Sequence, residues 1–457
     1  MDVQPKPKET EKRRWIYPLI RKGQLYNWRS RISYAYLALF FAGPFIRIGG
    51  QPLLLLNFVD RQFVILGQVF WPQDIFLFVL ASLVFIVCVV LFTIAYGRIF
   101  CGWVCPQTIF MEMYFRKIEQ WIEGDANKQK KLDAGTWTTN KILKKAIKHI
   151  LFLLFSFLIA NTFLAYIIGS VALIKIITES VQLHWAGFFS IWVFTLIFYI
   201  IYSRIRELVC TVICPYGRLQ GVMLDKDTLV VAYDEIRGEP RGKLNKSTDT
   251  LQPKGDCVDC GLCVQVCPTG IDIRQGTQME CVNCTACIDV CNDVMAKIHK
   301  PPELIGFYSE NMIRNRQRPT FTTRMMGYSV IIAVMMTVLC YFIFSRADMD
   351  LTIMRSAGML YQKQTGGLIS NIYNAEVINK SSTVRSILIS PADSAVKVKY
   401  IQQPGKINAG SSVKTVFFLL IRASDIHAPK TEIKINLLFN NKIIQTVSTT
   451  FVGPPND

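Results

Sequence analysis

The chain has 457 residues, 51% of them hydrophobic, and a mean hydropathy of +0.29. This apolar content excludes a disordered chain and an ordinary soluble cytosolic protein. The formal charge of +18 arises from 51 Lys and Arg residues against 33 Asp and Glu residues. In so apolar a chain, a basic excess indicates membrane topology and contact with anionic lipid, so we expect no nucleic-acid partner.

Five apolar stretches come into question as membrane spans, which require about 17 to 25 residues. They are Ile32–Ile48, Ile75–Tyr96, Ile150–Ile174, Trp185–Ile205 and Met325–Phe344. We therefore predict an α-helical bundle of five transmembrane helices in contact with membrane lipid. Two shorter apolar runs, Leu53–Leu56 and Phe63–Leu66, cannot span a bilayer. We expect them to pack against the bundle or to lie at the interface.

Lys and Arg residues near the helix ends predict the orientation of the bundle. Residues 1–31 contain nine of them and Gly97–His149 contains ten, whereas Gly49–Asp74 contains only Arg61. The N-terminal tail and Gly97–His149 are therefore predicted to be cytoplasmic. With five spans, Arg206–Arg324 is cytoplasmic as well, and the chain after the last span lies on the opposite side.

Eight of the 14 cysteines lie between residues 257 and 291. Residues 257–268 read C-x2-C-x2-C-x3-C-P, and residues 281–291 repeat the same cysteine spacing. Two copies of this spacing are typical of a bacterial ferredoxin, in which three thiolates hold one [4Fe–4S] cluster and the fourth ligates the other. We predict a first cluster at Cys257, Cys260, Cys263 and Cys291, and a second at Cys281, Cys284, Cys287 and Cys267.

Zinc is the alternative metal for such a segment, but zinc ribbons use two separated pairs of cysteines. The triplets therefore favour iron–sulfur clusters. Pro268 is expected to stop a local helix. Gly261 and Ala286 are small, as expected where backbone must approach an inorganic core.

A second cysteine pattern occurs twice, at the predicted cytoplasmic ends of the second and fourth spans. Residues 101–106 and 210–215 both read Cys-x3-Cys-Pro. In a helix, the two thiols of such a motif lie on one face and could converge on one metal ion. The proline should kink the helix end and free the carbonyl four residues earlier, at Gly102 or Thr211.

Copper is the metal that we predict at these thiols, because soft thiolates select Cu(I) over hard cations. The predicted copper ligands are Cys101, Cys105, Cys210 and Cys214. A site that stabilises Cu(I) more than Cu(II) raises the potential of the couple, so low-potential clusters can reduce it. Arg98 and Arg206 lie nearby in the sequence and are expected to lower the thiol pKa values.

Other roles for the paired cysteines stay open. They could be small packing residues, disulfides or redox dithiols. A reducing cytoplasmic face argues against disulfides, and the spacing differs from that of Cys-x-x-Cys dithiols. Cys88 and Cys340 are isolated within spans, where free cysteine packs as a small hydrophobe.

The chain after the last span changes to short runs of β character. Candidate strands are Val384–Ser390, Ala395–Ile401, Val413–Arg422, Glu432–Phe439 and Ile443–Phe451, with a turn at Asn440–Lys442. Their spacing predicts an immunoglobulin-like β-sandwich. This region has no catalytic constellation, so we expect a binding or packing module. A short strand is also expected at Thr228–Tyr233.

The predicted organisation has five parts. They are a basic cytoplasmic tail (residues 1–31), a four-helix membrane region (32–223), a cytoplasmic ferredoxin-type domain with linkers (224–324), a fifth transmembrane helix (325–344) and an immunoglobulin-like domain (345–457).

The sequence resembles the cytochrome c oxidase accessory proteins of the CcoG/FixG/RdxA type. The resemblance rests on Phe70–Asp74 (FWPQD), Cys101–Thr108 (CGWVCPQT), Glu123–Asp125 (EGD) and Cys257–Asp289. It implies a membrane-bound cupric reductase of the bacterial cytoplasmic membrane, with a periplasmic C-terminal domain. Such a protein reduces Cu(II) to Cu(I) for the copper–haem centre of a terminal oxidase.

The cofactors expected on this basis are two [4Fe–4S] clusters, with copper as substrate or bound ion. Expected partners are copper chaperones or oxidase assembly factors, oxidase subunits and an unknown electron donor, and a homodimer stays open. The alternative function is an electron relay of the NapH/NosR kind, which passes quinol electrons to a periplasmic reductase. A third is an assembly scaffold whose clusters only sense redox state.

Overall fold

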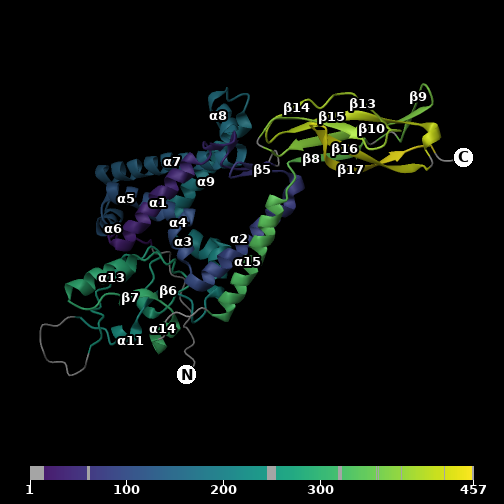
Figure 1. Cartoon of the computed structure of the whole chain (residues 1–457). Helices are drawn as coiled ribbons and strands as arrows, with labels where there is room; N and C mark the ends of the chain where they lie inside the picture. Colours follow the sequence, from purple (N-terminus) through teal and green to yellow (C-terminus); the bar gives the residue numbers. More distant parts are fainter. Residues whose placement is uncertain are drawn as a thin grey trace. The chain divides into compact units, whose positions relative to one another are not determined.

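The computed structural model describes residues 15–58, 62–243, 254–316, 322–356, 358, 360–381, 383–426 and 428–454. The first 14 residues of the predicted basic tail lie outside this set. The chain divides into two compact units (Figure 1). The first contains residues 1–42, 80–165 and 171–337, and the second contains residues 43–79, 166–170 and 338–457.

Helices dominate the first unit. They are α1 (Gln24–Ala42), α2 (Ile75–Tyr96), α3 (Ile99–Trp103), α4 (Pro106–Ile109), α5 (Arg116–Glu123), α6 (Ala126–Ala134), α7 (Thr139–Ile168), α8 (Ser170–Thr178), α9 (Trp185–Ile200), α10 (Pro215–Met223) and α15 (Thr323–Phe344), with π-helical η2 (Phe110–Phe115), η3 (Ile201–Ile205) and η4 (Val209–Ile213) between them. An aromatic core joins η2, α7 and η3, where Phe115 stacks on Tyr202 with ring centroids 4.3 Å apart.

Four helices of the described chain are long and apolar enough to cross a membrane: Ile75–Tyr96, Thr139–Ile168, Trp185–Ile205 and Thr323–Phe344. They correspond to the second to fifth predicted spans. In α15 only 6% of the most apolar window is buried by the protein, so this helix presents its side chains to its surroundings. Such an apolar surface is expected to face lipid.

The first predicted span differs in the structure. Helix α1 begins at Gln24 and ends at Ala42, and Arg47–Ile48 forms the short strand β1. The helix therefore includes the polar residues before Ile32 and omits the apolar end of the predicted range. It is not among the four membrane-length apolar helices of the described residues.

The third predicted span, Ile150–Ile174, is not continuous. Helix α7 starts earlier, at Thr139, and ends at Ile168. Gly169 then takes a φ of +86°, which breaks the helix before α8 begins at Ser170. Hydropathy alone did not register this break, because Gly169 lies within an apolar run.

The cysteine-dense segment lies between the two strands of a small sheet in the sequence. The elements of this region are β6 (Val230–Tyr233), α11 (Glu235–Gly238), α12 (Leu262–Gln265), η5 (Ile273–Gln275), α13 (Ala286–Lys297), β7 (Ile305–Tyr308) and α14 (Glu310–Asn315). Strands β6 and β7 pair antiparallel, which confirms the strand predicted near Thr228–Tyr233. Val231, Met295 and Ile305 are buried in the shared core.

The second unit contains an antiparallel β-sandwich. Its strands are β8 (Met349–Arg355), β9 (Gln362–Gln364), β10 (Leu368–Asn379), β11 (Arg385–Ser386), β12 (Leu388–Pro391), β13 (Lys397–Tyr400), β14 (Lys406–Ile407), β15 (Ser412–Arg422), β16 (Lys430–Phe439) and β17 (Lys442–Val452). One sheet has the order β13-β15-β10-β8, with β9 on β10, and the other has the order β12-β16-β17. Figure 1 shows these strands gathered at the C-terminal end of the chain.

Four of the five candidate strands of this domain are confirmed within a few residues. The fifth, Val384–Ser390, is divided into β11 and β12, which pair in different sheets. Asn440 and Asn441 both have positive φ, as a tight hairpin between β16 and β17 requires. Strands β8 and β10 were not predicted. Strand β10 carries the buried polar residues Ser370 and Asn371, and Asn371 Nδ2 donates to the Val452 carbonyl on the other sheet at 2.8 Å.

The apolar runs Leu53–Leu56 and Phe63–Leu66 form strands. They lie in β3 (Leu54–Asn57) and β4 (Gln62–Ile65), which pair with β5 (Gln68–Phe70) in a three-stranded sheet. We predicted only that these runs pack against the bundle or lie at the interface, and the sheet itself was not predicted. Runs of only four apolar residues do not distinguish a strand from a surface segment.

Asp74 anchors this part of the second unit. Its carboxylate pairs with Arg346 and with Lys380 Nζ at 2.7 Å, and Asp74 is only 8% exposed. Arg346 also donates to the Val69 carbonyl at 2.6 Å. The final residue of the Phe70–Asp74 stretch therefore joins the start of α2 to the end of α15 and to the β-sandwich.

Candidate iron–sulfur and thiol sites

Two cavities divide the cysteines of residues 257–291 into two groups. One cavity is lined by Cys257, Cys260, Cys263 and Cys291. A second is lined by Cys267, Cys281, Cys284 and Cys287, with Cys263 in its wall as well. These groups coincide with the two ligand sets predicted from the spacing. We call them the first-cluster cavity and the second-cluster cavity.

The backbone of each cysteine triplet curves around its cavity through left-handed residues. Asp259 and Asn283 both have φ of +52°, and Gly261 and Thr285 have φ of +65° and +66°. Each pair occupies equivalent positions in the two triplets. A Cβ added at Gly261 would meet nothing within 4 Å. This glycine therefore serves the backbone conformation, and Thr285 occupies the equivalent position in the second triplet.

The donor chemistry of both cavities fits iron–sulfur clusters. Each presents four thiols, and the remaining walls are mostly apolar, with Val231, Ile271 and Ile273 at the second-cluster cavity. A cubane is held by thiolates around its surface, whereas a single ion needs ligands that converge on one point. Within the described residues, no three or more His, Cys, Asp or Glu side chains converge as ligands of a single ion, either in these cavities or at the paired membrane cysteines.

The two Cys-x3-Cys-Pro motifs lie on short separate helices, not on kinked ends of the long helices. Gly97, with φ of +57°, ends α2 four residues before Cys101, and Arg206, with φ of +56°, ends η3 four residues before Cys210. Each proline then begins a new helix, because it tolerates the first helical position. The prediction of a kinked span was wrong in this respect.

The second cysteine of each motif leaves the helix in the same way. Cys105 and Cys214 are N-cap residues with ψ of 124° and 111°, so neither thiol follows helical geometry. Their backbone N–H groups donate to carbonyls five residues earlier, at 2.9 Å to Phe100 and 2.7 Å to Val209. The repeat noticed in the sequence is therefore also a repeat of backbone conformation.

Buried polar partners surround the first cysteine of each motif. The Cys101 thiol donates to Gln220 Oε1 at 3.0 Å, and Cys210 Sγ lies 3.7 Å from Thr108 Oγ1. Gln220 is fully buried. Sequence reasoning missed Gln220 and Thr108. The available signal was a polar residue a few positions after each Cys-Pro pair.

Burial decides the acidity of these thiols. It raises the pKa of Cys101 to about 11, although the nearby Arg98 guanidinium acts in the opposite direction. Burial likewise raises the pKa of Cys210 to about 11. Arg98 therefore acts in the expected direction, but burial outweighs it, and the pKa values of both thiols are raised instead of lowered. A metal that binds here must displace the thiol protons.

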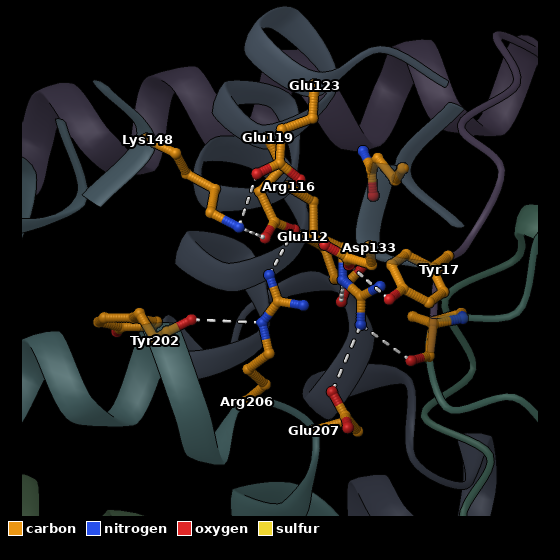
Figure 2. Close-up of polar contacts among 12 residues, drawn as sticks. Tyr17, Glu112, Arg116, Glu119, Glu123, Asp133, Lys148, Tyr202, Arg206 and Glu207 are labelled. Atoms are coloured by element: carbon orange, nitrogen blue, oxygen red, sulfur yellow. Dashed lines mark hydrogen bonds and ion pairs between the residues drawn. The ribbon is translucent and has the colours of Figure 1, made fainter. Parts of the chain in front are cut away.

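Arg206 has a different role from the one expected. It pairs with Glu119, which is contacted by Lys148 Nζ at 3.4 Å (Figure 2). Lys148 also reaches Glu123 at 2.9 Å. Burial raises the pKa of Glu119, but the cations Arg206, Lys148 and Arg116 outweigh it and hold the pKa below its usual range. This buried network, which includes Arg206, Glu119, Lys148 and Glu123, fixes the chain just before the second motif.

The comparisons with protein families agree with this division of the chain. A 4Fe-4S dicluster domain model matches residues 205–310. A 4Fe-4S binding domain model matches residues 78–125 and 183–226, and each stretch contains one Cys-x3-Cys-Pro motif. The IG-like fold at the C-terminus of FixG matches residues 339–454. Together with the four apolar helices, these matches define an iron–sulfur oxidoreductase of membrane type.

Curated relatives then identify the family. The chain is 32% identical over 400 residues to Protein RdxB of Cereibacter sphaeroides, covering 84% of this chain and 83% of that protein. It is 30% identical to the nitrogen fixation protein FixG of Rhizobium meliloti, with 83% and 79% covered, and 32% identical to Protein RdxA of Cereibacter sphaeroides, with 79% and 78% covered. The chain therefore belongs to the FixG/RdxA family, as the sequence resemblance indicated.

The chain was also compared with solved structures, and one of the matches covers only part of it. This match is a FixG-related protein from Vibrio parahaemolyticus, with a TM-score of 0.21 and 18% identity, covering 23% of this chain and 97% of that one.

Proposed function

We propose that the chain is a membrane-bound cupric reductase. Cys257, Cys260, Cys263 and Cys291 hold one [4Fe–4S] cluster, and Cys281, Cys284, Cys287 and Cys267 hold the other. When bound, these clusters supply one-electron transfer at low potential. Cys101, Cys105, Cys210 and Cys214 bind copper as the substrate.

The observation that carries this proposal is the meeting of the two motifs. Thr108 Oγ1, just after Cys105, lies 3.7 Å from Cys210 Sγ, and Gln220, just after Cys214, accepts from the Cys101 thiol at 3.0 Å. The two motifs therefore contact each other although they come from two distant stretches of sequence. Four soft donors favour Cu(I) over Cu(II). In each turnover one electron enters from a reduced flavin or iron–sulfur donor, and one Cu(II) becomes Cu(I). No proton is needed for the electron transfer itself.

We place the N-terminus and the ferredoxin-type domain in the cytoplasm and the C-terminal domain in the periplasm. The basic residues of the Gly97–His149 segment support this orientation. Cu(I) then passes to a copper chaperone or an assembly factor of a terminal cytochrome c oxidase. The immunoglobulin-like domain provides a surface for such a partner.

The test uses full-length protein purified without oxygen, with the clusters reduced before Cu(II) is added. Cluster reoxidation and Cu(I) formation are followed in the wild type and in Cys101→Ser with Cys210→Ser. Cys88→Ser with Cys340→Ser is the matched control, because these two cysteines are exposed and lie in α2 and α15. We expect loss of Cu(I) formation only in the first pair. Equal rates in all three proteins would remove the thiols from the mechanism.

A second candidate function is the electron relay. The match of both Cys-x3-Cys-Pro stretches to a 4Fe-4S binding domain favours a purely electron-transferring role for these thiols. Reoxidation of the reduced clusters by a quinone but not by Cu(II) would support the relay. Two clusters predict about eight iron atoms per chain, and a higher content would place further iron at the membrane thiols.

A further inference from the structure

The loop that carries the second cluster's thiols lies directly on the first Cys-x3-Cys segment. Gly102, between Cys101 and Cys105, is helical and needs no positive φ. A Cβ at this position would lie 2.4 Å from the Val282 carbonyl oxygen and 3.0 Å from that of Asn283. Gly102 is therefore required for close approach of the two backbones.

Polar contacts fix the same approach. Trp103 Nε1 donates to the Asn283 carbonyl at 3.3 Å, and Asn283 Nδ2 donates to the Tyr96 carbonyl at 3.4 Å. Arg98 donates to the Met279 carbonyl. Asn283 is only 2% exposed and lies between two ligands of the second-cluster set. These contacts hold the loop at Met279 and Asn283 against the segment from Tyr96 to Trp103.

The second motif reaches the same loops from the other side. Cys210 lines a small cavity together with Thr108 and Glu207. Pro268, Thr269 and Val282 belong to its wall and also to the wall of the second-cluster cavity.

Arg116 fixes this shared wall. Its Nη2 donates to the Pro268 carbonyl at 3.1 Å, and its guanidinium pairs with Glu112 at 2.7 Å and with Glu207 at 3.6 Å (Figure 2). Arg116 is only 3% exposed. Arg116 therefore holds Pro268, the residue after Cys267, close to Glu207, which precedes Cys210.

The first-cluster cavity lacks these neighbours. Its described lining comes from residues 233, 257–258, 260–263, 274, 290–291, 294–295 and 304–305, and none of them belongs to the Cys-x3-Cys segments. Cys260 in its wall is exposed. The wall of this cavity therefore reaches solvent at Cys260, and its lining lacks the contacts made by Gly102 and Arg116.

We infer that the second-cluster cavity serves the membrane thiols, that Gly102 is the positioning residue for this contact, and that the first-cluster cavity receives electrons from the donor at the exposed Cys260. This order rests on the proposed function, because it concerns how electrons reach the thiols. Electron transfer weakens steeply with separation, and positioning a cofactor against its reaction partner is the task of the protein. The position equivalent to Gly102 in the second motif is Thr211, so the close backbone approach belongs to the first motif.

The test compares Gly102→Ala with Gly327→Ala in full-length, oxygen-free protein in detergent. Gly327 lies in α15, and an added Cβ there meets nothing within 4 Å. The first readout is a potentiometric titration of the electron paramagnetic resonance signals of the reduced protein, without copper. Cys260→Ser and Cys284→Ser assign each signal to its cavity. The second readout is the rate of reoxidation by Cu(II) after reduction with dithionite.

We expect Gly102→Ala to change the signal that Cys284→Ser removes and to leave the other unchanged. Reoxidation by Cu(II) should slow by about tenfold or more, because small displacements strongly affect positioned reactants. Gly327→Ala should change neither readout. Cys260→Ser should keep rapid reoxidation, since dithionite reduces the remaining cluster directly, and Cys284→Ser should lose it.

A Gly102→Ala protein that changes only the other signal, or neither, would overturn the inference. Rapid reoxidation retained in Cys284→Ser but lost in Cys260→Ser would do the same. If Gly102→Ala does not fold, Trp103→Phe removes only the Nε1 donor to Asn283 and must shift the same signal. A wild type that Cu(II) does not reoxidise would refute the proposed function instead, and the copper-free titration would still decide which cavity adjoins the thiols.

Discussion

The two Cys-x3-Cys-Pro segments share one backbone design but have different surroundings. Both begin after a residue with positive φ, and in both the second cysteine caps a helix that starts with proline. The first segment contains Gly102, whose carbonyl accepts from Arg29 Nε at 2.7 Å. The second contains Thr211 and follows Arg206, which Glu119 neutralises. The repeat therefore determines how thiols are presented, and the neighbours determine what each pair contacts.

The largest effect should come from the buried charges before the second segment. Glu119→Ala leaves Arg206 and Lys148 without their shared carboxylate, and an uncompensated buried charge costs about 3–5 kcal/mol. We expect a large fall in the thermal unfolding midpoint in detergent. Glu310→Ala removes the exposed pair with Arg314 and should cost less than about 0.5 kcal/mol. Equal losses in the two variants would show that the buried network contributes nothing special.

The same network predicts acid sensitivity. Because the pKa of Glu119 is lowered on folding, its contribution is present above the usual carboxyl range and is lost as the pH falls through the lowered folded value. The wild type should therefore lose more stability on acidification than Glu119→Gln, in which this position no longer titrates. The measurement is the unfolding midpoint of both proteins across the acidic range.

Loss of one thiol should weaken copper binding in both segments alike. Removing the groups that merely orient metal ligands costs 10–100-fold in affinity, so Cys210→Ser or Cys101→Ser should weaken Cu(I) binding by about 100-fold or more. Competition with a chromophoric Cu(I) chelator measures this affinity. Cys88→Ser is the control, since Cys88 is exposed and isolated in α2. A loss confined to one segment would show that the two pairs do not share a site.

A smaller effect is expected from the hydrogen bond between Arg29 and the Gly102 carbonyl in the first segment. Arg29→Met removes an ionised donor from the buried Gly102 carbonyl, which should cost about 1.5–3 kcal/mol. The variant keeps the aliphatic part of the side chain, so the loss reports mainly on the hydrogen bond. Chemical or thermal unfolding of the cluster-loaded protein measures it, and a neutral result would mean that the freed carbonyl needs no partner.

The smallest effect concerns the residue equivalent to Gly102. Thr211 Oγ1 donates to the Glu207 carbonyl at 3.2 Å within its own segment. Thr211→Ala should therefore cost only about 0.5–1.5 kcal/mol, as for a typical hydrogen bond, and should leave both cluster signals unchanged. A change in the second-cluster signal would remove the asymmetry between the two segments.

The cysteine spacing by itself predicted both thiol groups, because a cubane is held by local triplets whose geometry depends on a few neighbouring residues. Four membrane-length helices and four of the five candidate strands were predicted correctly for a similar reason, since apolar length and alternation are local signals. Strand β10 escaped prediction because the polar residues Ser370 and Asn371 are both buried, which interrupts the alternation. Ser370 bonds to the neighbouring strand β9, and Asn371 bonds across the sandwich to Val452.

Only the tertiary structure decided which groups meet. The sequence suggested that Arg206 acts on a thiol, but the folded chain pairs it with Glu119 from α5. It also brings Gln220 to Cys101, Lys380 to Asp74, and the loop at Val282 to Gly102. These partners are far apart in the sequence, and burial sets the strength of their interactions, so no local pattern could reveal them.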